Sequence, residues 1–579
     1  MKRTLLFQKH IFPILLTLTI IISSFTGCTH KESFEDFTHS LFLEEVSSNT
    51  INLHYTIENP NAYGISMYNV SLGDFSAEAR SRTTSDLRNS LKTLTSYPYL
   101  TLSTEEKLTY DVLEDYLNTQ LALADYPLYQ EPLSGSGGLQ MELPILFAEY
   151  KFNSEQDVKD YLKLLSLTNE YFADIIEFEK EKSAAGLFMS DTICQTVIES
   201  CESFLENPEK HYLLATFENR LNTLNLSEKK YKQYKDKNRQ ILQQELFPAY
   251  ETMIFELEAL KGSGKNNMGL CHFPNGSDYY TLLCYSYTGC EDTIDQLFRK
   301  IELQRMQDLI TSANLQSEDS TIVSQCTYLE WEMPDAATML NHLKKEIQPS
   351  FPTPPTTHCE INYVEPALEE YLAPAFYIVA PIDNYLDNCI YINNAYVTND
   401  LYGFTTLAHE GYPGHLYQTV MSYEYNLPEV RTILNYPGYV EGWATYIEMM
   451  SFDYAGLEEN LSTMLSLNQA ATLSLYASSD IGLHYYGWSK EDMYAFWSGF
   501  GISDTETIDK ITQLILSEPG NYLKYYVGYL EFLSLQDYAR TLLGDEFSLK
   551  EFHRTILDIG PAPFAILEKY FLEYYSPQT

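Results

Sequence analysis

Positive charge is scarce in this sequence. Its 579 residues include 37 lysines and arginines against 80 aspartates and glutamates, which gives a net charge of -43. Nucleic acids and anionic membrane surfaces are bound largely through lysine and arginine side chains. The shortage of cations therefore argues against nucleic acid or an anionic lipid surface as the main partner. A hydrophobic content of 45% is ordinary for a globular protein with a large core.

Several common functional motifs are also missing. No C-x-x-C pair occurs, so the sequence gives no support for a zinc site made of cysteines. No G-x-S-x-G segment occurs, which removes the usual signature of a serine hydrolase. Gly264-Lys265 lacks both the upstream glycine and the following Ser or Thr of a phosphate-binding loop. Nucleotide binding is therefore rejected.

Cysteine usage does not establish a disulfide framework. Nine cysteines occur in the chain, and the eight that follow Cys28 are an even number, which permits disulfides without requiring them. Cys194 and Cys201 fall on one predicted helix, where their spacing separates them by about 10 Å along the axis. That separation is too long for a bridge. We expect these two cysteines not to pair with each other.

The start of the chain has a short apolar run rather than a membrane span. Ile11 to Ile22 follows two cationic residues and is shorter than the roughly 20 residues that a span needs. The sequence F-T-G-C at residues 25–28 resembles a bacterial lipobox, with phenylalanine at the usual leucine position. We therefore interpret residues 1–28 as a signal peptide with a lipobox, not as an uncleaved anchor. Cys28 is the expected lipidation site.

That interpretation predicts the location of the protein. An exported lipoprotein is held at the cell membrane by its N-terminal lipid only and faces outward. The acidic composition suits solubility outside the cell.

Helical patterns dominate the rest of the chain. Phe34 to Val46 and Ser103 to Leu123 read as helices, and the second has a capping serine or threonine followed by glutamates. A longer apolar pattern extends from Ser227 to Lys261 and is interrupted by Pro248. We expect a mainly α fold.

One proline-rich segment suggests an internal boundary. Four prolines make residues 349–357 a stiff connector. On this basis we divide the mature chain into a mostly helical N-terminal region, residues 29–348, and a region at residues 358–579 that we expect to be catalytic.

The second region contains H-E-G-Y-P-G-H at residues 409–415. In the zinc hydrolase pattern H-E-x-x-H, two histidines one helical turn apart bind the metal and the glutamate acts as general base. Here the second histidine follows after six residues, which on a regular helix turns it about 240° from the first. Pro413 and Gly414 can break the helix and bring His415 back toward His409. Glu410 would then be the base.

A second motif, E-G-W-A-T-Y-I-E, begins at Glu441 and ends at Glu448. A zinc site with three protein ligands needs one more group beside the two histidines, and Glu441 can supply it from a following helix. Glu448 lies two turns later on the same face and is a candidate partner for a ligand histidine. The alternative is that the His-Glu pair forms only the polar face of a helix.

The two motifs together resemble the signature of a bacterial zincin-like family known as domain of unknown function 885. H-E-x-x-P-G-H at residues 409–415 and E-G-W-A at residues 441–444 are the matching segments. The resemblance covers nearly the whole mature chain. It implies a mostly helical, zincin-like metallopeptidase fold that is distantly similar to the oligopeptidase and Taq-type carboxypeptidase clans.

Two downstream segments resemble parts of the same family. Asp480 and His484 lie four residues apart on a predicted helix, where a carboxylate can orient an imidazole, although a lone histidine is more often structural. In the segment at residues 519–528, Tyr525 matches the family's tyrosine. Tyr526 stands where the family usually has a lysine, so no role is transferred for that lysine. His484 and Tyr525 are the expected oxyanion donors.

A small β-hairpin is expected beside the metal helix. Ala375 to Val379 and Cys389 to Asn393 read as short strands, and Asn399 or Asp400 can cap the helix that follows. In zincins, a strand edge at this place pairs with the extended backbone of the substrate.

These observations predict a peptidase that uses Zn²⁺ and Glu410 to activate water and hydrolyse peptides at the cell surface. The alternative function is a surface lipoprotein that captures peptides or metal without turnover. A binder needs ligands but no general base, so the presence of Glu410 favours the enzyme. The sequence does not distinguish endopeptidase from exopeptidase activity, and it does not determine the oligomeric state.

Overall fold

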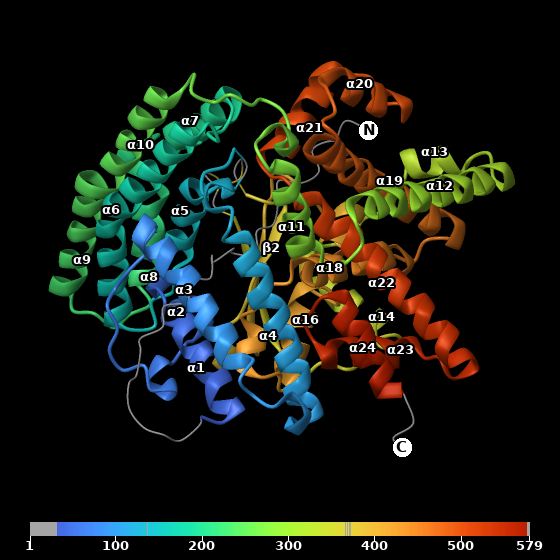
Figure 1. Cartoon of the computed structure of the whole chain (residues 1–579), viewed down its shortest axis with the longest axis horizontal. Coiled ribbons are helices and arrows are strands. Elements are labelled where there is room, and N and C mark those ends of the chain that lie inside the picture. Colours follow the sequence, from blue (N-terminus) through green and yellow to red (C-terminus); the bar gives the residue numbers. More distant parts are fainter. Residues whose placement is uncertain (1–31, 136, 365, 367–368, 370–371, 576–579) are drawn as a thin grey trace.

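The computed structural model describes residues 32–135, 137–364, 366, 369 and 372–575. Residues 1–28, with Cys28, lie outside the described residues, so the lipoprotein interpretation stays a prediction. Within the described chain, helices predominate and one small sheet is present (Figure 1). The expected mainly α fold with a small sheet is confirmed. No described helix is long and apolar enough to cross a membrane.

The chain begins with helices that pack on the second half of the protein. They are α1 (Phe34–Val46), α2 (Thr50–Thr56), α3 (Ala77–Leu94) and α4 (Thr104–Leu123). Ser103 starts α4 with a capping box: its hydroxyl accepts from the Glu106 N–H, and the Glu106 carboxylate accepts from the Ser103 N–H. Buried residues of α1 and α4 share one hydrophobic core with the helices near the C-terminus.

A separate group of helices has its own hydrophobic core and is called the α5–α10 lobe. It comprises α5 (Leu139–Glu149), α6 (Glu155–Ala185), α7 (Asp191–Phe204), α8 (Tyr212–Leu221), α9 (Glu228–Ile241) and α10 (Phe247–Leu260). A π-helical turn at Leu242–Leu246 joins α9 to α10. Pro248 comes just after this π-helical turn, which already interrupts the regular hydrogen-bond ladder, so the long predicted pattern continues through the proline.

The remaining helices form the rest of the body. They are α11 (Gly276–Thr288), α12 (Ile294–Glu318), α13 (Ile322–Thr327), α14 (Ala336–Glu346), α15 (Leu401–Glu410), α16 (His415–Glu424), α17 (Glu429–Thr432), α18 (Pro437–Tyr454), α19 (Glu459–Ile481), α20 (Lys490–Gly499), α21 (Thr505–Ser517), α22 (Asn521–Leu543), α23 (Leu549–Ile559) and α24 (Phe564–Tyr575). Apolar residues of α11 and α12 share a core with α19 and α22. Packing thus joins segments on both sides of residues 349–357, and the proposed division there stays a prediction.

The sheet has three strands in the order β1-β3-β2, with β1 (His358–Tyr363), β2 (Ala375–Ile378) and β3 (Asp387–Ile392). The predicted hairpin corresponds to the antiparallel pair β2 and β3. Strand β1 pairs parallel with β3 and was not predicted. Its residues are mostly exposed or half-buried, so its sequence lacks the apolar alternation that marks a strand.

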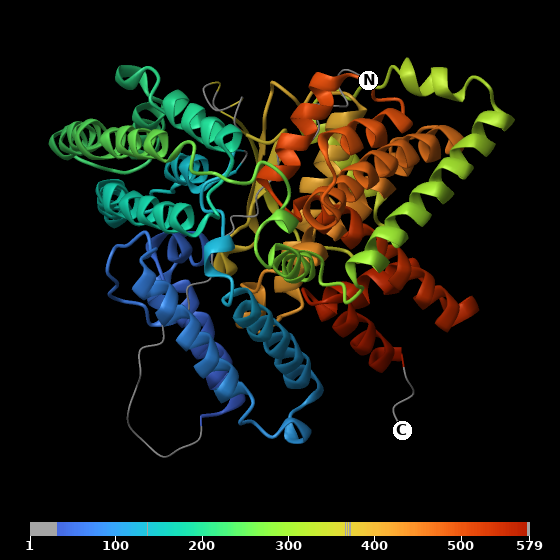
Figure 2. The same cartoon turned by 45° about the horizontal axis from the view of Figure 1, so that its top comes forward.

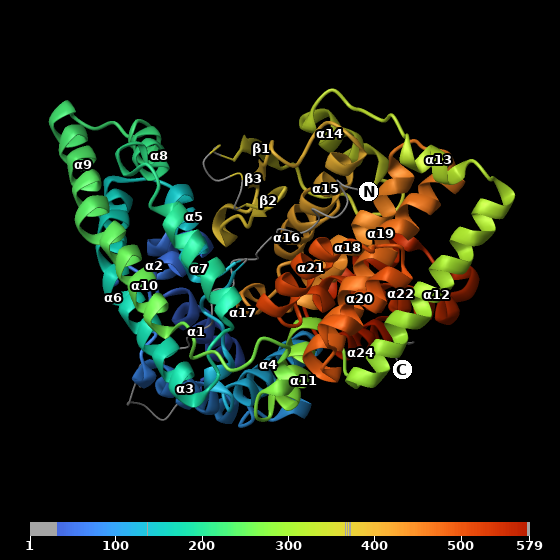
Figure 3. The ribbon, with the colours of Figure 1, turned by 90° about the horizontal axis from the view of Figure 1, so that it is seen from above.

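The sheet lies between the two sides of the molecule. Seen from above, the α5–α10 lobe is on the left, helices α12 to α16 and α18 to α24 are toward the right, α17 lies near α7 and α1, and α3, α4 and α11 lie below (Figure 3). In Figure 2 the first helices, drawn in blue, extend below the green helices of the lobe.

Two glycines bring the central helices α18 and α22 unusually close. A Cβ atom on Gly442 would lie 2.5 Å from the Cα atom of Gly528, and one on Gly528 would lie 2.3 Å from the carbonyl oxygen of Gly438. No side chain fits at these crossing points. The close approach places the N-terminal parts of α18 and α22 beside each other, and both parts contribute to the site described below.

Cys194 and Cys201, both on α7, do not form a disulfide with each other, as expected. All eight described cysteines are free, including Cys194 and Cys201.

Candidate metal centre

The helix that carries the first histidine breaks where the sequence predicts. Helix α15 ends at Glu410, and α16 begins at His415. A Cβ atom at Gly414 would lie 1.7 Å from the carbonyl oxygen of His409, so only glycine fits this turn. The indole N–H of Trp443 donates to the carbonyl oxygen of Pro413 over 2.9 Å and fixes the turn against α18.

The break brings the two histidines and Glu441 together. The imidazole rings of His409 and His415 have centroids 4.8 Å apart. The Oε2 atom of Glu441 lies 3.7 Å from Nε2 of His409 and 3.4 Å from Nε2 of His415. All three side chains are buried. The three predicted ligands therefore converge on one point although they come from three different helices.

Glu410 faces the same point from the end of α15. Its Oε1 atom lies 3.9 Å from Nε2 of His409. Its Oε2 atom accepts a hydrogen bond of 2.9 Å from the backbone N–H of Tyr377 in β2. Ligand atoms of His409, Glu410 and His415 all lie within 4.8 Å of one another, a spacing that a single metal ion can bridge. The strand thus fixes one carboxylate oxygen and leaves the other directed toward the histidines.

The polar atoms at this point are buried without partners among the described residues. Nε2 of His409, Oε1 of Glu410 and both carboxylate oxygens of Glu441 have no hydrogen-bond partner. Leaving such atoms unsatisfied away from water costs about 1–3 kcal/mol each. Four of them within one cluster indicate a place for a bound group that the protein atoms themselves do not provide.

Glu448 contacts Nδ1 of His409, the ring nitrogen that does not face Glu441. Its Oε2 atom lies 3.3 Å from Nδ1 of His409. Its Oε1 atom accepts a hydrogen bond of 2.9 Å from the side-chain amide of Gln469 on α19. This contact directs Nε2 of His409 toward Glu441. The arrangement is the one expected for a carboxylate that orients a ligand histidine.

The charges of the cluster favour a cation. Burial alone would lower the pKa of His409, but Glu441, Glu448 and Glu410 raise it to about 10. Burial alone would raise the pKa of Glu441, but its contacts with His409 and His415 hold it well below its usual range. The cluster therefore attracts positive charge, either protons on the imidazoles or a metal ion between them.

Sequence reasoning missed Lys524. Its Nζ atom lies 4.0 Å from Oε1 of Glu441, and its side chain is buried in the first turn of α22. No sequence motif marks this lysine, because its partner is more than eighty residues away along the chain. Lys524 approaches the Oε1 atom of Glu441, whereas both histidines approach its Oε2 atom. Burial lowers the pKa of Lys524.

Tyr525 is the next residue on α22. It is buried, and the Nζ atom of Lys524 lies 5.0 Å from the centre of its ring. Burial, followed by the charges of Glu441 and other carboxylates, raises the pKa of Tyr525 well above its ordinary value. The tyrosine therefore keeps its proton close to the metal centre. Its role as an oxyanion donor stays a prediction.

His484 does not join the cluster. It lies in the π-helical turn Gly482–Tyr486, and both of its ring nitrogens are used by the backbone. The N–H of Leu270 donates to Nδ1 over 3.1 Å, and Nε2 lies 3.0 Å from the carbonyl oxygen of Ile515, to which it donates. Burial lowers the pKa of His484 to about 4, so the ring is neutral at pH 7. Both ring nitrogens are therefore occupied by backbone groups in this structure, and the role of His484 as an oxyanion or substrate donor stays a prediction.

Asp480 does not orient His484 either. Its carboxylate accepts hydrogen bonds from the hydroxyl of Tyr280 at 2.5 Å and from the backbone N–H of Gly520 at 2.9 and 3.0 Å. His484 lies inside the π-helical turn, where the regular α-helical spacing from Asp480 does not hold. Asp480 instead fixes the start of α22, the helix that carries Lys524 and Tyr525.

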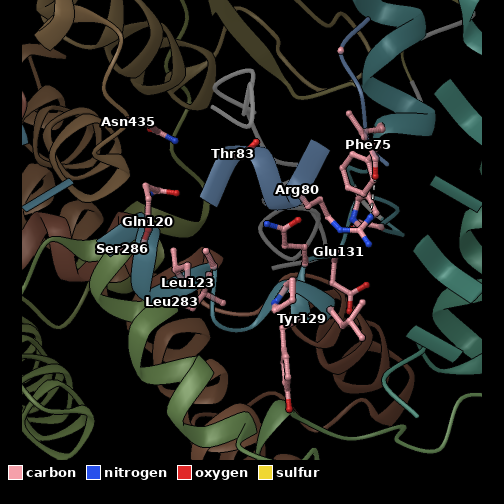
Figure 4. A pocket seen from close by; sticks show the side chains of 18 of the residues that line it. Phe75, Arg80, Thr83, Gln120, Leu123, Tyr129, Glu131, Leu283, Ser286 and Asn435 are labelled. Carbon is pink, nitrogen blue, oxygen red and sulfur yellow. Dashed lines mark hydrogen bonds between the residues drawn. The ribbon is translucent and has the colours of Figure 1, made fainter. Parts of the chain in front are cut away.

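Two cavities adjoin the centre. The larger, of about 790 Å³, is lined in part by Lys524 and by Asn521 at the start of α22. Figure 4 shows part of its wall, with Leu283 and Ser286 on one side and Arg80 on the other. The smaller, of about 370 Å³, extends along β2 and α16.

Comparison with solved structures gives the fold. A crystal structure described as a "putative lipoprotein" from Colwellia psychrerythraea matches with a TM-score of 0.80 and 20% identity, covering 94% of this chain and 99% of that chain. A second, from Shewanella oneidensis and described as a "putative lipoprotein of unknown function", matches with a TM-score of 0.63 and 16% identity, covering 93% and 100%. At these identities the likeness shows a shared fold only. No curated protein matches the sequence.

A family model matches residues 59–570 and is described as bacterial protein of unknown function, DUF885. This match includes the histidine motif, Glu441 and both downstream segments. The chain belongs to the DUF885 family.

Proposed function

We propose that this protein is a zinc peptidase, exported and held at the outer face of the cell membrane by a lipid on Cys28. The observation that carries the proposal is the convergence of four buried, unpartnered polar atoms from His409, Glu410 and Glu441. A structural polar cluster is normally satisfied by its own neighbours. This cluster is not satisfied in the described part of the chain.

The donor set fits zinc. Imidazole nitrogen and carboxylate oxygen are ordinary zinc ligands, and two histidines with one glutamate form a known catalytic ligand set. His409, His415 and Glu441 would hold the ion. Zinc would supply Lewis acidity, which makes a water molecule more acidic and polarises a peptide carbonyl.

Glu410 supplies the base in this proposal. The N–H of Tyr377 fixes its Oε2 atom, and its Oε1 atom has no hydrogen-bond partner in the described residues. That oxygen can accept a proton from a water molecule at the cluster and pass it to the leaving amine. Glu448 keeps His409 oriented, and Tyr525 can donate a hydrogen bond to the developing oxyanion.

One observation supports the proposed location. Two structures of the same fold are described as putative lipoproteins. A Cys28→Ala variant should lose labelling by a fatty acid in the bacterium, and labelling equal to that of the parent would refute the lipid anchor.

The alternative function is a lipoprotein that captures peptide or metal without turnover. One experiment on the purified protein separates the two. We expect about one zinc ion per chain and cleavage of a mixed peptide library that stops on addition of a chelator and returns with zinc. Stoichiometric zinc without cleavage of any peptide would favour the binding lipoprotein. A purified protein that does not bind zinc would refute the zinc site in either function.

A further inference from the structure

The smaller cavity has a one-sided charge pattern. It has a volume of about 370 Å³ and lies between α1, α2, α5, β2 and α16. The ionisable side chains in its described lining include Glu45, Glu142 and Glu149, but no lysine, arginine or histidine. The remaining walls are largely apolar. Such a cavity suits a ligand group that has an aliphatic stem and a positively charged end.

Two acceptor atoms in this cavity have no donor. Glu45 on α1 is 4% exposed, and its Oε2 atom has no hydrogen-bond partner among the described residues. Asn52 on α2 is 3% exposed and donates from Nδ2 to Oε1 of Glu45 over 3.2 Å, which leaves its Oδ1 atom unpartnered. Both side chains line the cavity. Two neighbouring acceptors without a donor call for an N–H group from a ligand.

Burial raises the pKa of Glu45 to about 8, and within the described part of the chain no cation offsets its loss of solvent. A cationic ligand group would supply that missing charge. Glu45 is thus a buried carboxylate with one oxygen that has no partner among the described residues, separate from the carboxylates of the metal centre.

Three residues that line the cavity lie next to residues of the metal centre. Tyr377, whose N–H holds Glu410, lines it. Val440, which precedes the proposed ligand Glu441, also lines it, as does Gln418, one helical turn after His415. The cavity therefore lies next to the residues that hold or precede the proposed base and ligands.

We propose that this cavity binds the side chain of a lysine or arginine that flanks the scissile bond, with Glu45 and Asn52 accepting its N–H groups. The inference rests on the proposed peptidase function, since it assigns the substrate class of that site. Apolar residues such as Ile145 and Phe376 contact the aliphatic stem, and the buried carboxylate binds the charged end.

The first test uses the parent protein loaded with zinc and a library of peptides with acetylated amino ends. Acetylation removes the α-ammonium, so selection for positive charge must come from side chains. We expect lysine or arginine next to the cleaved bond, with kcat/KM about 10-fold or more above that of a matched norleucine peptide. Equal rates for lysine and norleucine peptides would overturn the proposal.

The second test changes the cavity. In Glu45→Gln the size and the hydrogen bond from Asn52 are kept while the charge is removed. The ratio of kcat/KM for lysine over norleucine peptides should fall about 10-fold. Glu35→Gln changes an exposed glutamate on the same helix and should leave the ratio unchanged. An equal fall for both peptides in Glu45→Gln would indicate general damage to the fold and would contradict the assignment.

A binding measurement separates this inference from the peptidase proposal. Calorimetry would compare the binding of Nα-acetyl-lysine amide and Nα-acetyl-norleucine amide to the zinc-loaded Glu410→Gln variant. The same comparison would then be made with the zinc-loaded double variant that carries both Glu410→Gln and Glu45→Gln. Selective binding of the lysine amide that depends on Glu45 supports the cavity assignment even if no peptide is cleaved. Equal binding of the two amides refutes it even if peptides are cleaved.

Discussion

Two buried histidines in this protein have opposite surroundings. His409 is 5% exposed, lies among three carboxylates and has an Nε2 atom without a hydrogen-bond partner in the described chain. His484 is 1% exposed, and both of its nitrogens bind backbone groups. A buried polar group that is fully partnered holds the fold together, whereas one left unpartnered costs stability unless a ligand completes it.

Their electrostatics differ in the same way. Carboxylates raise the pKa of His409 to about 10, and burial lowers that of His484 to about 4. The first site attracts a cation, and the second excludes one. Burial alone therefore does not identify a functional histidine. The partners of its two nitrogens do.

The largest expected effect is the loss of the metal ligands. Replacement of His409, His415 or Glu441 by alanine removes one of three ligands, so each variant should lose most of its zinc and its peptidase activity together. Zinc content by mass spectrometry is the measurement. His484→Ala is the matched control and should keep its zinc. Zinc retained in His415→Ala would mean that His415, at the start of α16, is not a zinc ligand.

Glu410→Gln should separate chemistry from metal binding. The amide keeps the size and can still accept from the N–H of Tyr377, but it cannot take a proton. Turnover should fall by about 100-fold or more while zinc content stays at the parental value. Rates and zinc are to be measured on the same preparations. Parental turnover with full zinc would refute Glu410 as the base.

Glu448→Gln should have a smaller effect than loss of a ligand. Glutamine can still accept from Nδ1 of His409 but does not carry the charge that strengthens the histidine as a ligand. Zinc affinity should fall by about 10-fold, measured by competition with a chelator. Glu459→Gln, at an exposed position on α19, should leave the affinity unchanged. The same affinity in both variants would show that Glu448 does not tune the site.

His484→Ala should affect stability more than zinc binding. The change removes two hydrogen bonds to backbone and leaves a small void, which together cost about 2–4 kcal/mol. The Tm should therefore drop, with one zinc ion still bound per folded chain. His358→Ala, at an exposed position on β1, should leave the Tm close to that of the parent. Loss of zinc in folded His484→Ala would contradict the contrast drawn between the two histidines.

The pH dependence of that destabilisation is the smallest expected effect. The pKa of His484 is about 4 in the folded chain, below its ordinary value of about 6.5 in an unfolded chain. The unfolded chain therefore binds the proton first, and the stability that His484 contributes is present above pH 6.5 and lost as the pH falls toward 4. The Tm difference between the parent and His484→Ala should narrow from pH 7 to pH 4.5. A constant difference would show that His484 is not kept neutral by burial.

The metal motif could be predicted because its geometry is local. Five residues lie between His409 and His415, and Pro413 with Gly414 among them forces a break that any tertiary fold must accommodate. The mainly helical fold followed from repeated apolar spacing and from caps such as Ser103. In both cases the interacting residues are close in the sequence, so chain connectivity already limits where they can lie.

Only the tertiary structure determines contacts between residues that lie far apart in the sequence. The donor and acceptor that occupy His484 belong to Leu270 and Ile515, and no spacing rule connects them to the helix that carries it. Lys524 reaches Glu441 only because Gly442 and Gly528 let two helices touch. The residues of β1 can be recognised as a strand only from their pairing with β3. Sequence patterns show which chemical groups are available, but burial and packing of distant segments determine which of them are left for a ligand.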